Sequence, residues 1–505
     1  INASRAGFHP PESSELTEGK DGEYADWLGR DVVKAQVFWH SDVKQLPAII
    51  VNHSQIRALG ERHADTSLWL PAPGSCVLLL RPASAGPAFR LRDQSPNLWW
   101  VSAASRLCDI LPLLAARRKA LRNMGSFTFQ TLAGVVNCGT HGSGRELGCI
   151  ADDVESVDLA AGDGRLVRIE RTGGPTDPAQ GPPHGWTLIQ DDATFHRAVV
   201  GLGAFGVAVG YTLRVVDEYF LEEETAITTF EDATSDMDAL SRLGRHVELY
   251  INPYDRALGN KHGALRIVRT VLPGEPSRST VIDTTRPKQR LALKRAARVR
   301  SAARRFVRGQ GVARFRISIA LRFLRADDGA IRGPWWEVLR RDSFVCAHGF
   351  EVFFPMEVAR EGGVELLKTI DRESRFADQD VPLEQCVAAT TPVGMRFIKS
   401  SPHALAMTSE KYLDQGKEKT TKVWVSFEVG RLLGTPNPEV IPEAICRALT
   451  KARIPFRVHW GQFIPATAPL PLDVYPSFAD WKNTRATFDP HDKFVTARMR
   501  RMGLE

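Results

Sequence analysis

The sequence has little cysteine, and its cysteines show no arrangement typical of a disulfide framework or a zinc site. Only seven of 505 residues are cysteine, an odd number, and none stands in a CxxC pair. This pattern disfavours a disulfide-stapled secreted domain and a structural zinc site, so we predict no metal site. No apolar run approaches the roughly 18 residues of a membrane-spanning helix, and residues 1–5 lack the apolar core of a secretory signal. A reducing cytoplasm is the simplest compartment for such a chain.

Acidic residues are missing from one stretch of the chain. Residues 284–326 contain 14 of the 66 lysines and arginines and no aspartate or glutamate. The remaining 52 basic residues face 59 acidic ones, so the net charge of +7 comes from this stretch alone. A nucleic-acid partner is not expected, because no aromatic stacking platform accompanies the arginines. Within the stretch, 286–316 has two interpretations: a solvated insertion, which we favour, or a basic amphipathic helix in peripheral contact with an anionic membrane.

The length and the mixture of strand and helix patterns predict an α+β protein with more than one domain. Short strands and helices alternate early in the chain, whereas longer strands dominate later, and we place a domain boundary near Asp217. The local patterns also predict a helix at 44–51 and a strand at 198–202. A further helix is predicted at 105–121, with Ser105 as its N-cap and Pro112 as either a kink or the true start.

One glycine pattern matches a dinucleotide-binding turn only in spacing. Gly201-Leu-Gly-Ala-Phe-Gly206 fits GxGxxG, but such a turn should open a helix whose N-terminus faces the phosphates. The residues from Val207 onward are rich in β-formers and predict a strand instead. We therefore reject a Rossmann interpretation and expect a glycine turn between strands.

A longer stretch rich in glycine, serine and threonine occupies residues 125–144. Small residues recur in it, and Thr131, Thr140 and Ser143 add hydroxyl donors. Without side chains in the way, backbone N–H groups can approach an anion such as a pyrophosphate. The alternative is a tight loop packed only for shape.

Several motifs follow one another in a fixed order along the chain. They are Ile56-Arg-Ala-Leu-Gly-Glu-Arg-His63, Gly125-Ser126, Thr131-Leu-Ala-Gly134, Gly139-Thr-His-Gly-Ser-Gly144, residues 199–207, Arg457-Val-His-Trp-Gly-Gln462 and Phe488-Asp-Pro-His-Asp-Lys-Phe494. In this order they resemble the FAD-binding domain of the vanillyl-alcohol-oxidase superfamily, and most of all its sugar-alcohol and aldonolactone oxidase branch. The resemblance is weakest over residues 1–30 and in the middle of the chain.

The resemblance implies a PCMH-type fold in three parts. Residues 1–217 would form two α+β subdomains that hold FAD, and 218–455 a cap with an antiparallel sheet, flanking helices and the basic insertion at 284–326. Residues 456–505 would return to the FAD domain. The cofactor-binding positions carried over are Gly60, Arg62, His63, Ala64, Gly125, Ser126, Thr131, Gly134, Gly139, Thr140, His141, Gly142, Ser143, Gly144, Gly203, Gly206 and Val207.

His63 stands where many members of the branch attach FAD covalently through a histidine. The serine that follows in the family is Ala64 here, and the segment up to Thr66 is shortened. A covalent link through His63 is therefore one expectation, and an ordinary surface histidine is the other. His141, inside the glycine-rich stretch, is expected to donate a hydrogen bond to the backbone of its own loop.

Two charged groups of the family are missing here: the glutamate of its ExR strand is Gly394, and the lysine of its closing motif is Gln462. Arg396 matches the ExR arginine and is expected near the flavin, where a guanidinium stabilises negative charge; an exposed strand arginine is the alternative. Glu351 alternates with aromatic residues and faces either the cap cavity or solvent. The catalytic candidates are Arg396, Glu351, Gln462 and His459, with His403 as a further acid–base candidate.

The resemblance predicts an FAD-dependent oxidoreductase that takes hydride from a CH–OH group of a sugar alcohol, lactone or related alcohol to flavin N5. Oxygen is the expected acceptor, giving H2O2, and another electron acceptor is the close alternative. Two further functions remain open. One is oxidative tailoring of a larger metabolite by cyclisation or desaturation, which the changes at Gly394 and Gln462 favour. The other is a non-catalytic, membrane-associated relative.

Overall fold

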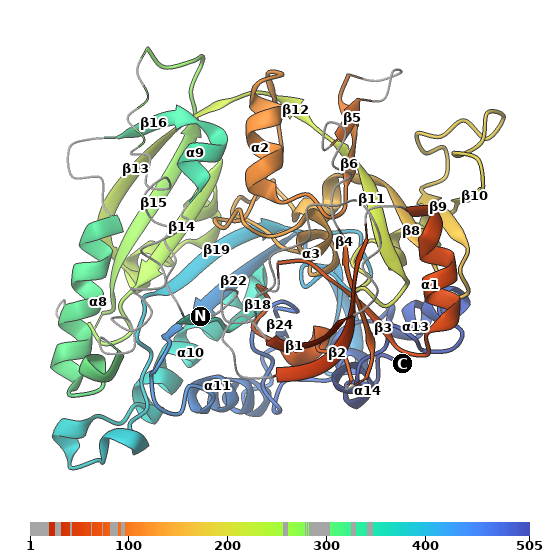
Figure 1. Ribbon diagram of the computed structural model, residues 1–505. Coiled ribbons are helices and arrows are strands. Elements are labelled where there is room, and N and C mark those ends of the chain that lie inside the picture. The colour runs from red at the N-terminus through yellow and green to blue at the C-terminus, as the bar shows by residue number, and fades with distance from the viewer. Residues whose placement is uncertain are drawn as a thin grey trace.

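The computed structural model describes residues 20–25, 32–40, 43–61, 63–72, 74–80, 89–91, 96–255, 261–277, 279, 281, 303–324, 330–340 and 347–505. In these residues the chain forms three main β-sheets with helices packed against them, which confirms the α+β class (Figure 1). Arg62, an expected cofactor-binding residue, and residues 284–302 and 325–326 of the basic insertion lie outside the described residues.

The first sheet has the strand order β1-β2-β4-β3, in which β2, β4 and β3 are parallel. Its elements are β1 (Lys20–Ala25), β2 (Val32–His40), α1 (Leu46–Asn52), β3 (Ile56–Leu59) and β4 (Cys76–Leu80). Helix α1 confirms the helix expected at 44–51, and Pro47 stands in its first turn, where a missing N–H breaks no helical hydrogen bond. Strand β3 ends directly before Gly60, so it forms the first half of the motif at 56–63.

The second sheet has the order β10-β9-β8-β11-β6-β5. Its strands are β5 (Phe89–Leu91), β6 (Leu98–Ser102), β8 (Val154–Ala160), β9 (Leu166–Glu170), β10 (Trp186–Gln190) and β11 (Val207–Arg214). Helices α2 (Leu107–Ala115), α3 (Leu132–Asn137) and α4 (Asp192–Ala198) accompany it, and β7 (Lys119–Ala120) pairs with β12 (Val216–Asp217). Gly206 leads straight into β11 with no helix, which confirms the rejection of a Rossmann turn.

Two local predictions are wrong. Helix α2 is much shorter than 105–121, and Arg106 rather than Ser105 is its N-cap. Residues 198–202 are the end of α4 and a turn rather than a strand. The apolar side chains that suggested a strand are buried from that turn, in which Leu202 has a φ of 55°.

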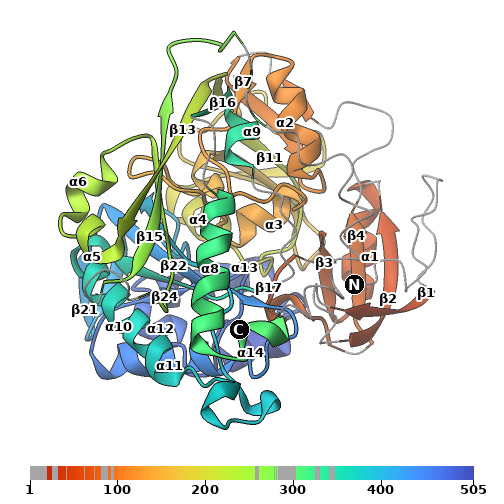
Figure 2. The same ribbon diagram turned by 90° about the vertical axis from the view of Figure 1, so that its left-hand side faces the viewer.

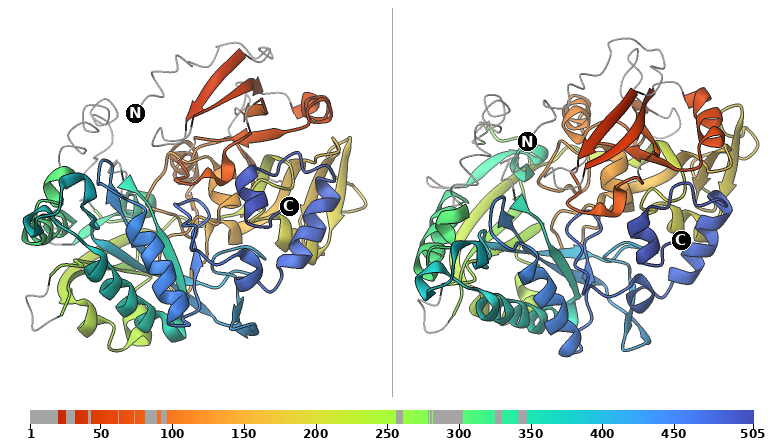
Figure 3. Two further views of the ribbon diagram at one scale, coloured as in Figure 1. Left: turned by 90° about the horizontal axis from the view of Figure 1, so that it is seen from below. Right: turned by 60° about the horizontal axis from the view of Figure 1, so that its bottom comes forward.

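The third sheet is fully antiparallel, with the order β16-β13-β15-β14-β19-β22-β18-β24. Its strands are β13 (Phe220–Thr229), β14 (His246–Ile251), β15 (Gly263–Val271), β16 (Ile331–Pro334), β18 (Glu351–Pro355), β19 (Val393–Lys399), β22 (Val423–Val429) and β24 (Arg457–Val458). Seen from below, helices of the same region lie over one face (Figure 3). They include α10 (Ala359–Glu373), whose Gly362 and Gly363 lie against Phe354 and Phe427, and α11 (Val440–Lys451). Because side chains alternate along a strand, neighbours such as Glu351 and Glu428 point to the opposite face.

Smaller elements complete this region. They are α5 (Phe230–Ala233), α6 (Met237–Ser241), α8 (Gln310–Leu324), α9 (Trp335–Leu339), and the two-stranded pairs β17 (Ala347–His348) with β23 (Arg431–Leu432) and β20 (Lys411–Asp414) with β21 (Lys417–Thr420). Helix α8 lies on the outside of the molecule (Figure 2). None of the described helices is long and apolar enough to cross a membrane.

The C-terminal segment starts in the third sheet and ends against the first. After β24 it forms α12 (Pro471–Val474), α13 (Phe478–Phe488) and α14 (Ala497–Arg501). The Ile56 N–H then donates to the Lys493 carbonyl, and Lys493 Nζ lies 2.6 Å from the Ile50 carbonyl oxygen. The C-terminal segment is thus held against β3 and helix α1.

Candidate active site

A cavity of about 450 Å³ is lined by residues from the N-terminal sheets, the third sheet and the C-terminal segment. Two parts of its wall differ in composition. The cradle wall comes from the N-terminal region and contains Arg57, Gly60, Gly125, Ser126, Thr131, Gly134 and Gly203. The charged wall comes from the third sheet and the segment after it, and contains Glu351, Arg396, Glu428 and Gln462.

Arg57 is the buried cation of the cradle wall. Its guanidinium donates to the carbonyls of Leu202 (2.7 Å), Gly203 (3.0 Å) and Phe494 (3.0 Å). Burial lowers its pKa to about 10, so it remains charged at neutral pH. Its Nε has no hydrogen-bond partner among the described residues. A charged donor without a partner in a cavity wall fits an anionic group of a ligand.

Gly60 shows why the cradle wall needs small residues. A Cβ on Gly60 would lie 2.2 Å from Thr131 Oγ1, so a side chain there would displace the N-terminal cap of α3. The Thr131 hydroxyl accepts from the Gly134 N–H, which fixes the start of that helix. Strand β3 and helix α3 therefore approach closely at the cavity.

The expected cofactor-binding residues divide into two groups by position. Those that line the cavity are Gly60, His63, Ala64, Gly125, Ser126, Thr131, Gly134, Thr140, His141, Gly203 and Gly206. Those that do not are Gly139, Gly142, Ser143, Gly144 and Val207. Several of the second group have structural contacts instead: the Gly144 N–H donates to the Phe397 carbonyl, and the Ser143 hydroxyl donates to Glu248.

His63 lines the cavity and its ring packs edge-on against Phe127, with ring centroids 4.3 Å apart. Burial lowers its pKa to about 3, so the imidazole is neutral at physiological pH. The shortened segment that follows is fixed by Asp65, whose N–H donates to the Gly461 carbonyl and whose Oδ2 accepts from the Gly349 N–H. Asp65 thus ties the His63 loop to the residues just before β18 and to the C-terminal segment.

The charged wall is a row of side chains across neighbouring strands. Tyr250, Gly394, Glu428 and Glu351 stand directly opposite one another on β14, β19, β22 and β18. Such cross-strand neighbours share one face of a sheet. Arg396, two residues along β19 from Gly394, reaches Glu428 Oε2 at 2.8 Å and Glu351 Oε1 at 3.5 Å.

Glu351 is a buried carboxylate held in its ionised form. Burial by itself would raise its pKa, but His141, His459 and Arg396 beside it outweigh burial and hold the pKa well below the usual range. Gln462 Nε2 donates to Glu351 Oε2 at 3.1 Å, which fixes the carboxylate. Burial likewise opposes the charge of Arg396, but Glu428 outweighs it and raises the Arg396 pKa above its usual value.

Two histidines complete the surroundings of Glu351. His141 Nδ1 lies 2.8 Å from the Gly142 carbonyl, as expected for a ring that donates to its own loop, and Nε2 lies 3.5 Å from Glu351 Oε1. Burial lowers the pKa of His459 to about 4, and its Nδ1 accepts from the Gly461 N–H. His141, Glu351 and His459 lie close enough to ligate a metal. Arg396 and Gln462 already contact the carboxylate, however, so we assign no metal there.

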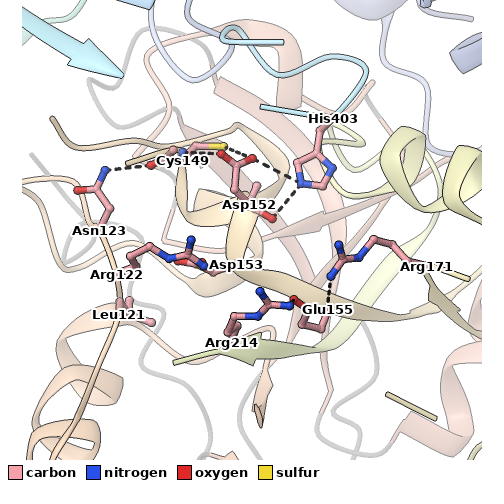
Figure 4. Close-up of polar contacts among 12 residues, drawn as sticks. Leu121, Arg122, Asn123, Cys149, Asp152, Asp153, Glu155, Arg171, Arg214 and His403 are labelled. Atoms are coloured by element: carbon pink, nitrogen blue, oxygen red, sulfur yellow. Dashed lines mark hydrogen bonds and ion pairs between the residues drawn. The ribbon is translucent and has the colours of Figure 1, made fainter. Parts of the chain in front are cut away.

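A second buried network lies outside the cavity, where residues 149–153 meet the loop that follows β19 (Figure 4). The hydroxyl of Ser401 donates to Asp152 Oδ1 at 2.5 Å, and the Cys149 thiol lies 3.3 Å from the same oxygen. His403 Nε2 lies 3.1 Å from the Ala151 carbonyl oxygen. Burial raises the pKa of Asp152 to about 6 and lowers that of His403 to about 3. His403 is therefore a neutral residue of this junction and does not line the cavity.

The cavity fits FAD on the chemistry of its walls. The cradle wall combines small residues with a buried arginine that has a donor to spare, which suits a pyrophosphate. The neighbouring part of the cavity wall provides rings and an amide for a polar heterocycle, from His63, His141, His459 and Gln462.

Three residues of the site were not predicted from the sequence: Arg57, Asp65 and Glu428. The sequence did contain a signal for Arg57, because it is a single cation within an otherwise apolar strand. It contained no local signal for Glu428.

Comparison with known proteins gives matches in sequence and in fold. Residues 211–502 match the family model of D-arabinono-1,4-lactone oxidase. The D-arabinono-1,4-lactone oxidase of Candida albicans is 24% identical over 262 residues, which cover 48% of this chain and 43% of that protein. The L-gulonolactone oxidase of Bos taurus is 27% identical over 139 residues, or 28% of each protein. The matched segments thus span less than half of these relatives.

Solved structures share the fold over nearly the whole chain. A solvent-stable cholesterol oxidase superposes with a TM-score of 0.70 at 17% identity, covering 98% of this chain and all of that one. The cholesterol oxidase from B. sterolicum gives 0.72 at 12% identity, covering 98% and 99%. The fold agrees with the PCMH-type architecture that the motifs indicated. Because the family model covers more than half of the chain, the protein belongs to the D-arabinono-1,4-lactone oxidase family, within the aldonolactone oxidase branch of the vanillyl-alcohol-oxidase superfamily.

Proposed function

We propose that the protein is an FAD-dependent oxidoreductase that oxidises a CH–OH group of a small polyhydroxylated alcohol or lactone. The observation that carries the proposal is an ionised, buried Glu351 next to Arg396 in the wall of a cavity whose other wall fits a pyrophosphate. When bound, FAD supplies the two-electron acceptor for the hydride of the CH–OH carbon, and O2 (giving H2O2) or another acceptor reoxidises it.

The charged wall provides the acid–base chemistry. Glu351 would accept the proton of the substrate hydroxyl as the carbon loses its hydride, because only then is the hydroxyl acidic enough for a carboxylate of low pKa, and the ionised carboxylate lines the cavity. Arg396 donates to the oxygen as negative charge develops on it, and Gln462 holds the carboxylate of Glu351 in place.

The cradle wall would hold the cofactor. Arg57 and the glycines at 60, 125, 134 and 203 would bind the pyrophosphate, and His63 would attach the flavin covalently. A neutral imidazole in the cavity wall supports that attachment, because only the uncharged ring can form a new bond through nitrogen.

An absorption spectrum of the purified protein, before and after acid precipitation, tests the cofactor. Yellow colour in the pellet is expected, and His63→Ala should release it to the supernatant. Turnover of sugar alcohols and aldonolactones, followed with an oxygen electrode and with a dye acceptor, tests the reaction. A colourless protein that takes up no added FAD would refute the proposal.

A second candidate is oxidation of a bulkier metabolite. A Cβ on Gly394 would meet no atom nearer than 3.8 Å, so there is room beside the charged wall. A comparison of bulky hydrophobic alcohols with polyols would separate the two candidates. Polyols used at much lower kcat/KM than the bulky alcohols would favour the second.

We also propose a peripheral membrane contact through α8. Phe315 is 65% exposed and Val312 39% exposed on this helix, and arginines at 304, 305, 308, 314 and 322 are exposed around them. Exposed apolar residues among cations suit the surface of an anionic bilayer. The part of the insertion at 286–302 lies outside the described residues.

A further inference from the structure

The charged wall has more negative than positive groups. Of its described residues, Glu351 and Glu428 are carboxylates and Arg396 is the permanent cation. The same Nη1 atom of Arg396 serves both carboxylates, at 3.5 Å and 2.8 Å. One guanidinium cannot balance two carboxylates, so this wall keeps an excess negative charge.

The same wall has more hydrogen-bond acceptors than donors. Gln462 Nε2 faces both carboxylates, at 3.1 Å from Glu351 and 3.4 Å from Glu428. That orientation leaves Gln462 Oε1 buried and without a partner among the described residues. A buried acceptor without a donor costs free energy until a ligand supplies one. The wall therefore fits a ligand that donates hydrogen bonds and carries no negative charge.

Glu428 is the carboxylate that an entering ligand meets. Its side chain is 34% exposed, whereas that of Glu351 is 3% exposed. On the neighbouring strand it faces Gly394, which has no side chain to cover it. Like charges brought together in a partly desolvated cavity repel strongly, because water screens them poorly there.

We propose that Glu428 is a specificity-determining residue, which makes the cavity accept neutral or positively charged polyhydroxylated substrates and reject those that carry a carboxylate. The inference rests on the proposed function, because it takes the cavity as the substrate site. It goes further by fixing the charge of the substrate and by naming the residue that selects it.

Three probes with the same hydroxylated carbon chain test the inference on the purified holoprotein. They are D-glucitol, 1-amino-1-deoxy-D-glucitol and D-gluconate, which share the hydroxyl-bearing carbons C2–C6 and carry a neutral hydroxymethyl, a positive aminomethyl and a negative carboxylate group at the remaining end. We expect kcat/KM for gluconate to be at least tenfold below that for glucitol, and the amine to equal or exceed glucitol. Higher ionic strength should narrow the gap. The shift in melting temperature on adding each probe should follow the same order.

Variants at Glu428 separate charge from shape. Glu428→Gln should bring the glucitol-to-gluconate ratio at least fivefold closer to one, whereas Glu428→Asp, which keeps the charge, should retain most of it. Glu418→Gln removes an equal charge from the exposed β21 and should leave the ratio unchanged.

Each failure has its own signature. Gluconate handled as well as glucitol, a ratio unaffected by Glu428→Gln, or no melting shift and no turnover with any probe would overturn the inference. Absence of flavin and of turnover, with the order of melting shifts intact, would refute the proposed function and leave the charge selection standing.

Discussion

The two walls of the cavity hold their functional groups in different ways. The cradle wall relies on short stretches of chain in which small residues expose the backbone, with Arg57 as its buried cation. The charged wall relies on side chains from β18, β19 and β22 and from the segment after β24. Its partners lie far apart in sequence: Gln462 and Glu351, in hydrogen-bond contact, are 111 residues apart.

The difference decides how each wall tolerates substitution. A backbone N–H is present whatever the side chain, so the cradle wall fails only where a side chain blocks an approach, as at Gly60. In the charged wall, a carboxylate can stand on a neighbouring strand, about 5 Å away, and still reach the arginine. Gly394 lacks the expected glutamate, yet Glu428 and Glu351 occupy the same cross-strand row and both contact Arg396.

Glu351→Gln should have the largest effect, because it removes the proton acceptor of the charged wall while keeping its shape. We expect kcat/KM to fall by about 10²- to 10⁴-fold, the usual range for general base catalysis. Flavin content should stay at the wild-type level, since the cradle wall is untouched. Steady-state kinetics and the absorption spectrum measure both, with Glu418→Gln as the matched control. Wild-type kcat/KM in the variant would place the base elsewhere.

The pH profile sharpens the same assignment. Because its neighbours hold the pKa of Glu351 below the usual range, the carboxylate should remain ionised throughout pH 5 to 8. Glu351 should therefore cause no fall of kcat/KM as the pH is lowered within that window. An acid limb there that disappears in Glu351→Gln would contradict the assignment.

Arg57→Met should affect the cradle wall alone. The change leaves the carbonyls of Leu202, Gly203 and Phe494 without their donor, so we expect the free energy of unfolding to fall by about 3 kcal/mol. FAD affinity should fall with it, whereas the preference among charged and neutral substrates should persist. Denaturant unfolding and FAD titration measure the two effects. Full FAD affinity in the variant would remove Arg57 from the cofactor site.

The contrast between the walls also explains what the sequence could predict. A site formed by the backbone leaves a local signal in the sequence, because its glycines and short motifs lie close together in the chain. The fold class, the glycine turn before β11 and much of the cradle wall could therefore be predicted. His63 and Gly125 line the cavity, whereas Gly139, Gly142 and Gly144 do not. A glycine required for packing and one required for a ligand look identical in a single sequence.

The charged wall could be predicted only in part. The motif around Arg396 was visible, and Glu351 was a candidate because it alternates with aromatic residues. Glu428 escaped notice because its role depends on the pairing of β22 with β18 and β19, which no local pattern gives. The strand expected at 198–202 failed for a related reason: apolar residues in a buried turn have no periodicity that separates them from a strand.

The second buried network, around Asp152, should respond to pH. Burial raises the pKa of Asp152 from 3.8 to about 6, so the folded state favours the neutral acid. Its contribution to stability is full below pH 3.8, declines as the pH rises towards 6, and is lost above that, by about 3 kcal/mol at most. Asp152→Asn cannot ionise and should lose less stability than the wild type between pH 4 and 7. Unfolding curves across this range test it against Asp217→Asn, whose side chain is 89% exposed; parallel wild-type and Asp152→Asn profiles would contradict it.

Helix α8 belongs to neither wall, and changing it should leave catalysis intact. Replacing Val312 and Phe315 together by Ser removes exposed apolar area at little cost to folding, because the buried face of the helix is formed by Ala313 and Ile317. Binding to vesicles containing phosphatidylserine should weaken by about thirtyfold, since the two lost contacts, at about 1 kcal/mol each, together contribute about 2 kcal/mol. Co-sedimentation with these vesicles measures the change, and neutral phosphatidylcholine vesicles show whether the arginines contribute. Binding that the double variant leaves unchanged, or no binding to either kind of vesicle, would make α8 a solvated insertion. The two walls would then account for the function of the described residues without any membrane contact.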